Sequence, residues 1–247
     1  MVTAPTLPPP PALIAAGHCV LLDFDGTLVD LVDRPDAVVV DDALVELLQH
    51  LTGTFAGRLA LVSGRSVAQI ENFLGHAVRG IAVVGSHGAE LQVLGKRITP
   101  ARPAALDEAE RTFSAAFADE QGVLVEVKSL GVAIHYRMAP EQGATAHRLA
   151  ERFAGTDGLV LQSGKMMVEL RAGGHDKGTG ITSLLTHPTF AGHTPVFVGD
   201  DVTDEAGFAA VARENGVGVL VGPMRATAAS HRLDDVAAVR AWLGAAA

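Results

Sequence analysis

The chain has 247 residues, which is enough for one large domain or two modest ones. Its residues are 48% apolar and 19% charged, a balance that supports a packed core and argues against wholesale disorder. The formal net charge of −9 argues against a general binder of nucleic acids or anionic membranes. No apolar run approaches the roughly 20 residues of a membrane span.

Cysteine content and the N-terminal residues indicate the compartment. The single cysteine, Cys19, excludes an internal disulfide and a cysteine-based zinc cluster, and it fits a reducing compartment. No lysine or arginine precedes the first apolar stretch, so a secretory signal is not expected. We therefore expect a cytoplasmic protein with a small-molecule partner. We favour a monomer, although the sequence does not specify an oligomeric state.

The prolines at 8–11 favour an extended N-terminal segment, and a polyproline ligand is the alternative.

The first hundred residues alternate between apolar strands and amphipathic helices. Alternation of this kind is typical of a parallel α/β sheet. Strands are expected over 19–22, 59–62 and 81–85, and helices over 42–52 and 67–74.

The pattern changes near residue 102. Period-two alternation over 123–128 and 132–137, with a short turn between them, predicts an antiparallel hairpin. Helices are expected over 104–120 and 141–154, and a strand over 166–171. We therefore predict a small α+β insertion over residues 101–174.

The α/β pattern then resumes with a helix from Lys177, strands over 195–199 and 217–221, and a last helix that contains Trp242. The predicted fold class is thus α/β, with a Rossmann-like parallel-sheet core that is interrupted by the insertion. The core would consist of residues 1–100 and 175–247.

Two acidic clusters follow apolar strands. Asp23 and Asp25 leave the first strand and, as residues i and i+2 of an extended backbone, point to the same side. Asp200 and Asp204 follow the strand over 195–199. Ligands bind beyond the carboxyl ends of parallel strands, and so many carboxylates in one crevice need a hard cation such as Mg²⁺. The alternative is that acidic residues after strands only cap helices.

Two further strand and helix ends suit an anion. Ser63-Gly64-Arg65 offers a hydroxyl, a backbone amide and a guanidinium, which together make a phosphate cradle. Lys177 lies at a predicted helix start, where its charge adds to the positive end of the helix. A plain turn is the alternative for the Ser-Gly-Arg segment.

The strands of the insertion have one polar face. His135 and Arg137 share a side of one strand, and Glu169 and Arg171 share a side of another. With helices packed on the apolar face, the polar face could supply the paired donors and acceptors that a sugar requires. The alternative is a solvated sheet face with cross-strand ion pairs.

Four of these segments resemble, in order, the four motifs of the haloacid dehalogenase superfamily of phosphatases. They are Asp23-Phe24-Asp25-Gly26-Thr27-Leu28, Ser63-Gly64-Arg65, Lys177 and Gly199-Asp200-Asp201-x-Thr203-Asp204.

Other segments resemble the trehalose-6-phosphate phosphatase family, and the likeness extends from about residue 19 to 243. The family commonly has proline where this chain has Ala172. The segments are Asp33-Arg34-Pro35-Asp36-Ala37, Gly85-Ser86-His87-Gly88-Ala89-Glu90, His135-Tyr136-Arg137, Gly164-Lys165-x-x-Val168-Glu169-Leu170-Arg171 and Asp176-Lys177-Gly178.

The resemblance implies a role for each catalytic residue. Asp23 would be the nucleophile and form an aspartyl-phosphate, while Asp25, protonated at the first step, would act as acid and then as base. Mg²⁺ would be held by Asp23, the backbone carbonyl of Asp25 and Asp200. Ser63 and Lys177 would hold the phosphoryl oxygens, and Asp204 would support the metal or Lys177.

The resemblance also implies that the insertion is a cap that recognises the sugar. His87 would either contact the ligand or close a turn. Arg65, from the phosphate cradle, completes the predicted substrate-binding set. The cap residues are Lys128, His135, Arg137, Lys165 and Glu169.

The implied function is Mg²⁺-dependent hydrolysis of trehalose 6-phosphate to trehalose and phosphate, the last step of trehalose biosynthesis. Another sugar-phosphate phosphatase, of the sucrose-phosphate or mannosyl-phosphoglycerate type, is the alternative enzyme. The alternative from another class is an inactive sugar-phosphate-binding protein. That hypothesis is disfavoured because the expected catalytic residues are all present.

Overall fold

The computed structural model describes residues 7–13, 15–32, 34–164 and 166–246. The described chain forms two compact units. The first contains the residues up to Ile98 together with those from Asp176 onward, and the second is Thr99–His175.

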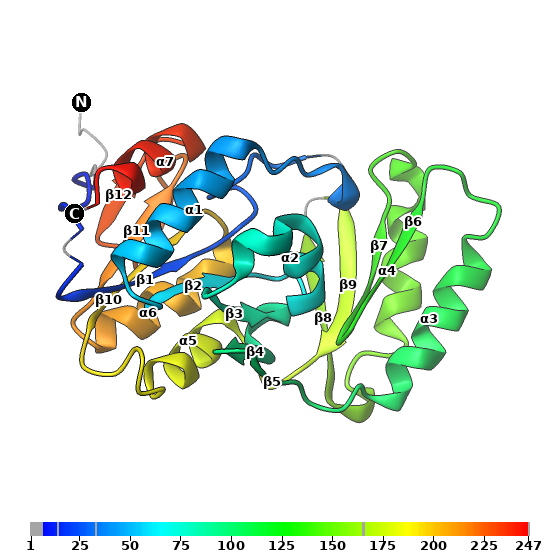
Figure 1. The fold of residues 1–247 in the computed structure, drawn as a ribbon. Helices are drawn as coiled ribbons and strands as arrows, with labels where there is room; N and C mark the ends of the chain where they lie inside the picture. The colour runs from blue at the N-terminus through cyan, green and yellow to red at the C-terminus, as the bar shows by residue number, and fades with distance from the viewer. Residues whose placement is uncertain (1–6, 14, 33, 165, 247) are drawn as a thin grey trace. The chain divides into compact units, whose positions relative to one another are not determined.

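An eight-stranded sheet forms the centre of the first unit (Figure 1). The six neighbouring strands from β12 to β3 are parallel, and β4 and β5 extend the sheet antiparallel. This arrangement confirms the predicted α/β class. In sheet order the strands are β12 (His231–Leu233), β11 (Val217–Val221), β10 (Thr194–Gly199), β1 (His18–Leu22), β2 (Leu59–Val62), β3 (Ala82–Gly85), β4 (Glu90–Val93) and β5 (Lys96–Ile98).

Helices cover both faces of this sheet (Figure 1). Because side chains alternate along a strand, Val20 and Leu22 of β1 enter one core and Cys19 and Leu21 the other. None of the described helices combines the length and apolarity needed to cross a membrane. The first core includes α1 (Asp42–Thr54), α2 (Val67–Leu74) and α7 (Val236–Gly244), and the second includes α5 (Lys177–Leu185) and α6 (Glu205–Arg213).

The second unit is an antiparallel sheet with helices on one face. Its core is completed by the rings of Phe113 and Phe153, which meet edge to face with centroids 5.8 Å apart. The helices are α3 (Ala104–Ala116) and α4 (Gly143–Glu151). In sheet order the strands are β6 (Leu124–Lys128), β7 (Gly131–His135), β9 (Met167–Ala172) and β8 (Leu159–Gly164).

Both units also contain short 3₁₀ helices. They often mark the start of a helix or the turn after a strand. They are η1 (Pro35–Ala37), η2 (Gly75–Val78), η3 (Ser86–Gly88), η4 (Pro140–Gln142), η5 (Thr156–Gly158) and η6 (Val202–Asp204).

Several elements differ from the sequence-based prediction. The strands β4, β5, β8 and β12 were not predicted, because they are short or partly polar and β5 is exposed throughout. The helix that we predicted to reach residue 120 ends at Ala116. The strand that we predicted to reach Arg137 ends at His135, so Arg137 lies in a turn and the strand alternation does not orient it.

Candidate active site

The ends of three adjacent strands bring the predicted core residues together. In the sheet β1 lies between β10 and β2, so Asp23, which follows β1, lies between the segments that carry Asp200 and Ser63. The backbone N–H of Asp23 donates to the carbonyl of Val198 at 2.9 Å. The crossovers that leave the adjacent strands β1 and β10 lead to β2 and β11, in opposite directions along the sheet. Open α/β sheets place ligands at such a point.

A buried ammonium group links two of the carboxylates. Asp176 caps α5 by accepting from the N–H of Thr179 at 2.7 Å, and this fixes Lys177 at the helix start. The Lys177 Nζ donates to Oδ1 of Asp23 at 2.7 Å and to Oδ1 of Asp204 at 2.6 Å. All three side chains are at most 5% exposed. The pairing therefore compensates charges that solvent does not reach.

Burial and the neighbouring charges shift the pKa values of Asp23, Asp200 and Lys177. Burial raises the pKa of Asp23 well above its usual value, and the Asp204 and Asp200 charges add to this while Lys177 opposes it. Burial, and then the Asp204 charge, raise the pKa of Asp200 to about 6. Burial disfavours the Lys177 ammonium, but the charges of Asp204 and Asp23 outweigh it and raise the pKa of Lys177.

The same carboxylates can hold a divalent cation. Asp23, Asp200 and Asp204 each offer an oxygen, and these oxygens lie within 4.8 Å of one another. Oδ1 of Asp200 is buried and has no hydrogen-bond partner among the described residues. A buried carboxylate oxygen without a donor, in an all-oxygen set, fits a hard metal ion.

Gly26 allows the first motif to approach Asp200. Its φ of +82° is favourable only for glycine, and a Cβ placed there would lie 2.3 Å from Oδ2 of Asp200. The close approach explains why a glycine follows Asp25 in this turn.

Asp25 does not share the partner of Asp23. Its two carboxylate oxygens accept from Nε and Nη2 of Arg65, both at 2.7 Å. The Arg65 guanidinium also donates through Nη1 to the carbonyl of Pro35 at 3.0 Å. The guanidinium that we predicted to bind phosphate is thus directed at Asp25.

Ser63 and His87 lie in two turns that touch. The Ser63 Oγ accepts from the backbone N–H of Arg65 at 3.1 Å, and the N–H of His87 donates to the Ser63 carbonyl at 3.1 Å. The His87 ring packs on Gly64, where a Cβ would lie 2.5 Å from the ring carbon Cε1. His87, with a φ of +54°, therefore closes the turn beside Ser63.

Two of the predicted substrate residues of the second unit pair with each other, and a third has an acidic neighbour. The Lys128 Nζ donates to Oε2 of Glu169 at 2.8 Å, and only 3% of the Glu169 side chain is exposed. His135 lies 2.8 Å from Oε2 of Glu126, a residue that we did not predict. Lys165, which we also predicted, lies outside the described residues, as does Asp33 of the resemblance.

Arg225 is a residue near the site that sequence reasoning missed. Its Nη2 donates to the carbonyls of Asp201 at 2.7 Å and Asp200 at 3.2 Å, and its Nη1 pairs with Glu205. Arg225 thereby holds the backbone of the second acidic cluster. One arginine in a loop gives no signal of this role in the sequence.

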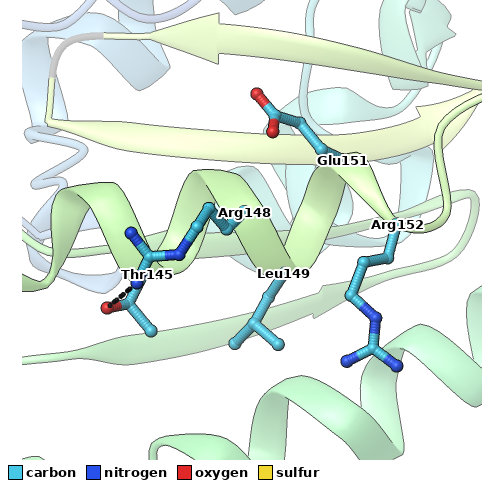
Figure 2. A pocket seen from close by; sticks show the side chains of 5 residues that line it. All are labelled: Thr145, Arg148, Leu149, Glu151 and Arg152. Carbon is cyan, nitrogen blue, oxygen red and sulfur yellow. Dashed lines mark hydrogen bonds between the residues drawn. The ribbon is translucent and has the colours of Figure 1, made fainter.

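A hollow of about 650 Å³ lies elsewhere, on α4 in the second unit (Figure 2). It is lined by Thr145, Arg148, Leu149, Glu151 and Arg152, and Arg148 donates to the Thr145 hydroxyl at 3.1 Å. These residues all lie on α4 or at its C-terminal end, and both arginines are exposed. The buried carboxylates of the first unit are therefore the better candidate for chemistry.

Comparison with known proteins identifies similar chains. A family model described as trehalose-phosphatase matches residues 21–237. A protein of Sinorhizobium fredii named a probable trehalose-phosphate phosphatase is 38% identical over 227 residues, which cover 90% of this chain and 84% of that protein. The trehalose-6-phosphate phosphatase of Escherichia coli is 37% identical over 233 residues, which cover 93% of this chain and 86% of that protein.

Solved structures with the same fold cover most of the chain. The C-terminal domain of C. albicans trehalose-6-phosphate phosphatase gives a TM-score of 0.77 at 23% identity, with coverage of 92% of this chain and 91% of that one. A protein described as related to trehalose-6-phosphate phosphatase gives a TM-score of 0.73 at 27% identity, with coverage of 91% and 94%. These matches confirm the fold class.

Removal of the buried ammonium is expected to destabilise the protein. Lys177→Met leaves Asp23 and Asp204 buried without their cation, which costs about 3 kcal/mol of unfolding free energy. Urea unfolding in chelator near neutral pH measures this loss. Lys96→Met, at an exposed lysine of β5, is the matched control and should change stability by less than about 0.5 kcal/mol. Equal stability of the two variants would contradict the buried pairing.

Proposed function

The chain belongs to the trehalose-phosphatase family, and from that premise we propose that it hydrolyses trehalose 6-phosphate to trehalose and phosphate. One observation carries the proposal: the Lys177 ammonium lies between Asp23 and Asp204 at the carboxyl end of β1, with Asp200 beside them. Two relatives at 37% and 38% identity have names that include trehalose phosphate and phosphatase.

The proposed reaction has two steps. An Asp23 oxygen attacks phosphorus, the bond from phosphorus to the sugar oxygen breaks, and Asp25 gives that oxygen its proton. Water then attacks the aspartyl-phosphate while Asp25 takes its proton, and phosphate leaves with Asp23 regenerated. Lys177 and Ser63 stabilise the negative charge that develops on the phosphoryl oxygens.

We assign Mg²⁺ to the acidic cluster. Asp23, Asp200 and the backbone carbonyl of Asp25 would hold it, and Asp204 would orient Lys177 beside it. The unpartnered Oδ1 of Asp200 supports this assignment. When bound, Mg²⁺ neutralises part of the negative charge and so weakens the repulsion between a carboxylate nucleophile and a phosphate dianion.

The second unit is proposed to be the cap that recognises the sugar. Lys128 and Glu169 form an ion pair with little exposure, and His135 pairs with Glu126 on the neighbouring strand. Buried charged groups of this kind can exchange part of their pairing for the hydroxyl groups of a disaccharide. Arg137, in the turn after β7, would add a further donor.

Phosphate release from trehalose 6-phosphate tests the function. We expect turnover with Mg²⁺, none in excess EDTA, and recovery when Mg²⁺ is restored. Sucrose 6-phosphate and glucose 6-phosphate should react at least about 10-fold more slowly, because they lack part of the hydroxyl pattern. Asp23→Asn should retain its fold and lose turnover. Faster hydrolysis of sucrose 6-phosphate would contradict the substrate assignment.

The stabilisation by Mg²⁺ should depend on pH. The pKa of Asp200 is 3.8 in the unfolded chain and is raised to about 6 in the folded protein. The stability that Asp200 contributes in its protonated form is therefore fully present below pH 3.8 and is lost as the pH rises through 6. Mg²⁺ binds the ionised carboxylates, so the Tm gain from Mg²⁺ should grow between about pH 4 and pH 7.

Thermal unfolding with Mg²⁺ and with EDTA across that range measures the effect. Asp200→Asn should lose the Tm gain, whereas Asp234→Asn, at an exposed aspartate, should keep it. A Tm gain that is the same at every pH would contradict metal binding by this cluster.

Specificity is expected to depend on Glu169. Glu169→Gln keeps the shape but weakens hydrogen bonds to sugar hydroxyls, so kcat/KM for trehalose 6-phosphate should fall roughly 10- to 100-fold. Glu151→Gln, at an exposed glutamate of α4, is the control. Hydrolysis of p-nitrophenyl phosphate, which has no sugar, should change little. An equal loss on both substrates would assign Glu169 to the stability of the fold.

A further inference from the structure

The Arg65 guanidinium is held on several sides. Its Nε and Nη2 donate to the Asp25 carboxylate at 2.7 Å each, and its Nη1 donates to the carbonyl of Pro35 at 3.0 Å. Its Cζ lies 4.6 Å from the centroid of the Phe73 ring and 5.9 Å from that of Phe24. Only 10% of the Arg65 side chain is exposed. These contacts fix the orientation of the guanidinium.

The edge formed by Nε and Nη2 is one of the edges of arginine that can bind phosphate or carboxylate in a bidentate manner. In this structure that edge is occupied by Asp25. A phosphate group would have to displace a charged carboxylate from a nearly buried fork before it could bind there. That fork is therefore not available for bidentate phosphate binding by Arg65 in this structure.

Asp25, in contrast, depends on Arg65 for its orientation. Asp25 follows the end of β1, where its backbone forms an isolated bridge with Val29, but its side chain is 30% exposed, so the backbone alone does not fix the carboxylate. With the fork bound, each carboxylate oxygen still has a second lone pair that can carry a proton. The fork thus fixes the carboxylate without blocking proton transfer.

We propose that Arg65 is a positioning residue that holds the Asp25 carboxyl group in place for proton transfer, and that it is not a phosphate ligand. This inference rests on the proposed phosphatase function. It extends that function, because Phe73 and the Pro35 carbonyl become part of the support of Asp25.

A double-mutant cycle separates the two roles. Arg65→Lys keeps the positive charge but loses the fork, and Asp25→Asn loses the proton-transfer group. If Arg65 acts through Asp25, Arg65→Lys should lower kcat for trehalose 6-phosphate by about 100-fold in the wild type. In the Asp25→Asn background it should lower kcat by less than about 3-fold, because the group that it positions is already absent.

Inhibition by inorganic phosphate gives a second readout that a positioning role would not move. The inhibition constant should change by less than about 3-fold in Arg65→Lys, since the lost contact is to Asp25. Additive losses in the cycle, or a phosphate inhibition constant raised by more than about 10-fold, would overturn the proposal and assign Arg65 to the phosphate.

The controls keep the outcomes distinguishable. Arg97→Lys alters an arginine that pairs with Glu71 at the exposed edge of the sheet, and its kcat should match that of the wild type. If Arg65→Lys does not fold, Phe73→Leu, which removes the ring under the guanidinium, replaces it in the cycle.

If the wild type releases no phosphate from trehalose 6-phosphate, the proposed function fails. The cycle on p-nitrophenyl phosphate then still tests Arg65, because hydrolysis of the aspartyl-phosphate also requires Asp25.

Discussion

The Lys177 ammonium is the constraint on which the site depends. Asp23 and Asp204 both accept hydrogen bonds from it, and Asp200 lies close enough to share a cation with them. Burial, and then the charges of the neighbouring carboxylates, raise the pKa values of Asp23 and Asp200, and the positive charge of Lys177 opposes this. The lysine supplies a permanent part of the positive charge that the carboxylates and the phosphate of the substrate require, and the proposed Mg²⁺ would supply more.

The backbone of the fold determines where these charged side chains lie. Asp23 and Asp200 follow adjacent parallel strands, and Lys177 begins a helix that is capped by Asp176. None of these residues depends on a long loop for its position. Arg225 donates to two carbonyls of the loop after β10 and so helps to hold that loop in place. Such fixed elements can hold catalytic groups with the tolerance that proton and phosphoryl transfer require.

Much of this arrangement was predictable from the sequence, because Asp23, Ser63 and Asp200 each follow an apolar run that ends in a turn. The pairing of Asp25 with Arg65 was not predictable. It depends on the side-chain conformation and on a carbonyl from the loop after the first motif, and neither leaves a periodic pattern. The exposed strand β5 was missed for a similar reason, since its residues bury no apolar face.

Detection of the covalent intermediate tests the central claim most directly. Trehalose 6-phosphate that carries labelled phosphorus would be mixed with the protein and Mg²⁺, quenched in acid within milliseconds, and digested for peptide mapping. The account predicts label on the peptide that contains Asp23, and none in Asp23→Asn. Rapid release of labelled phosphate with no label on that peptide at any time point would contradict the assignment of Asp23 as the nucleophile.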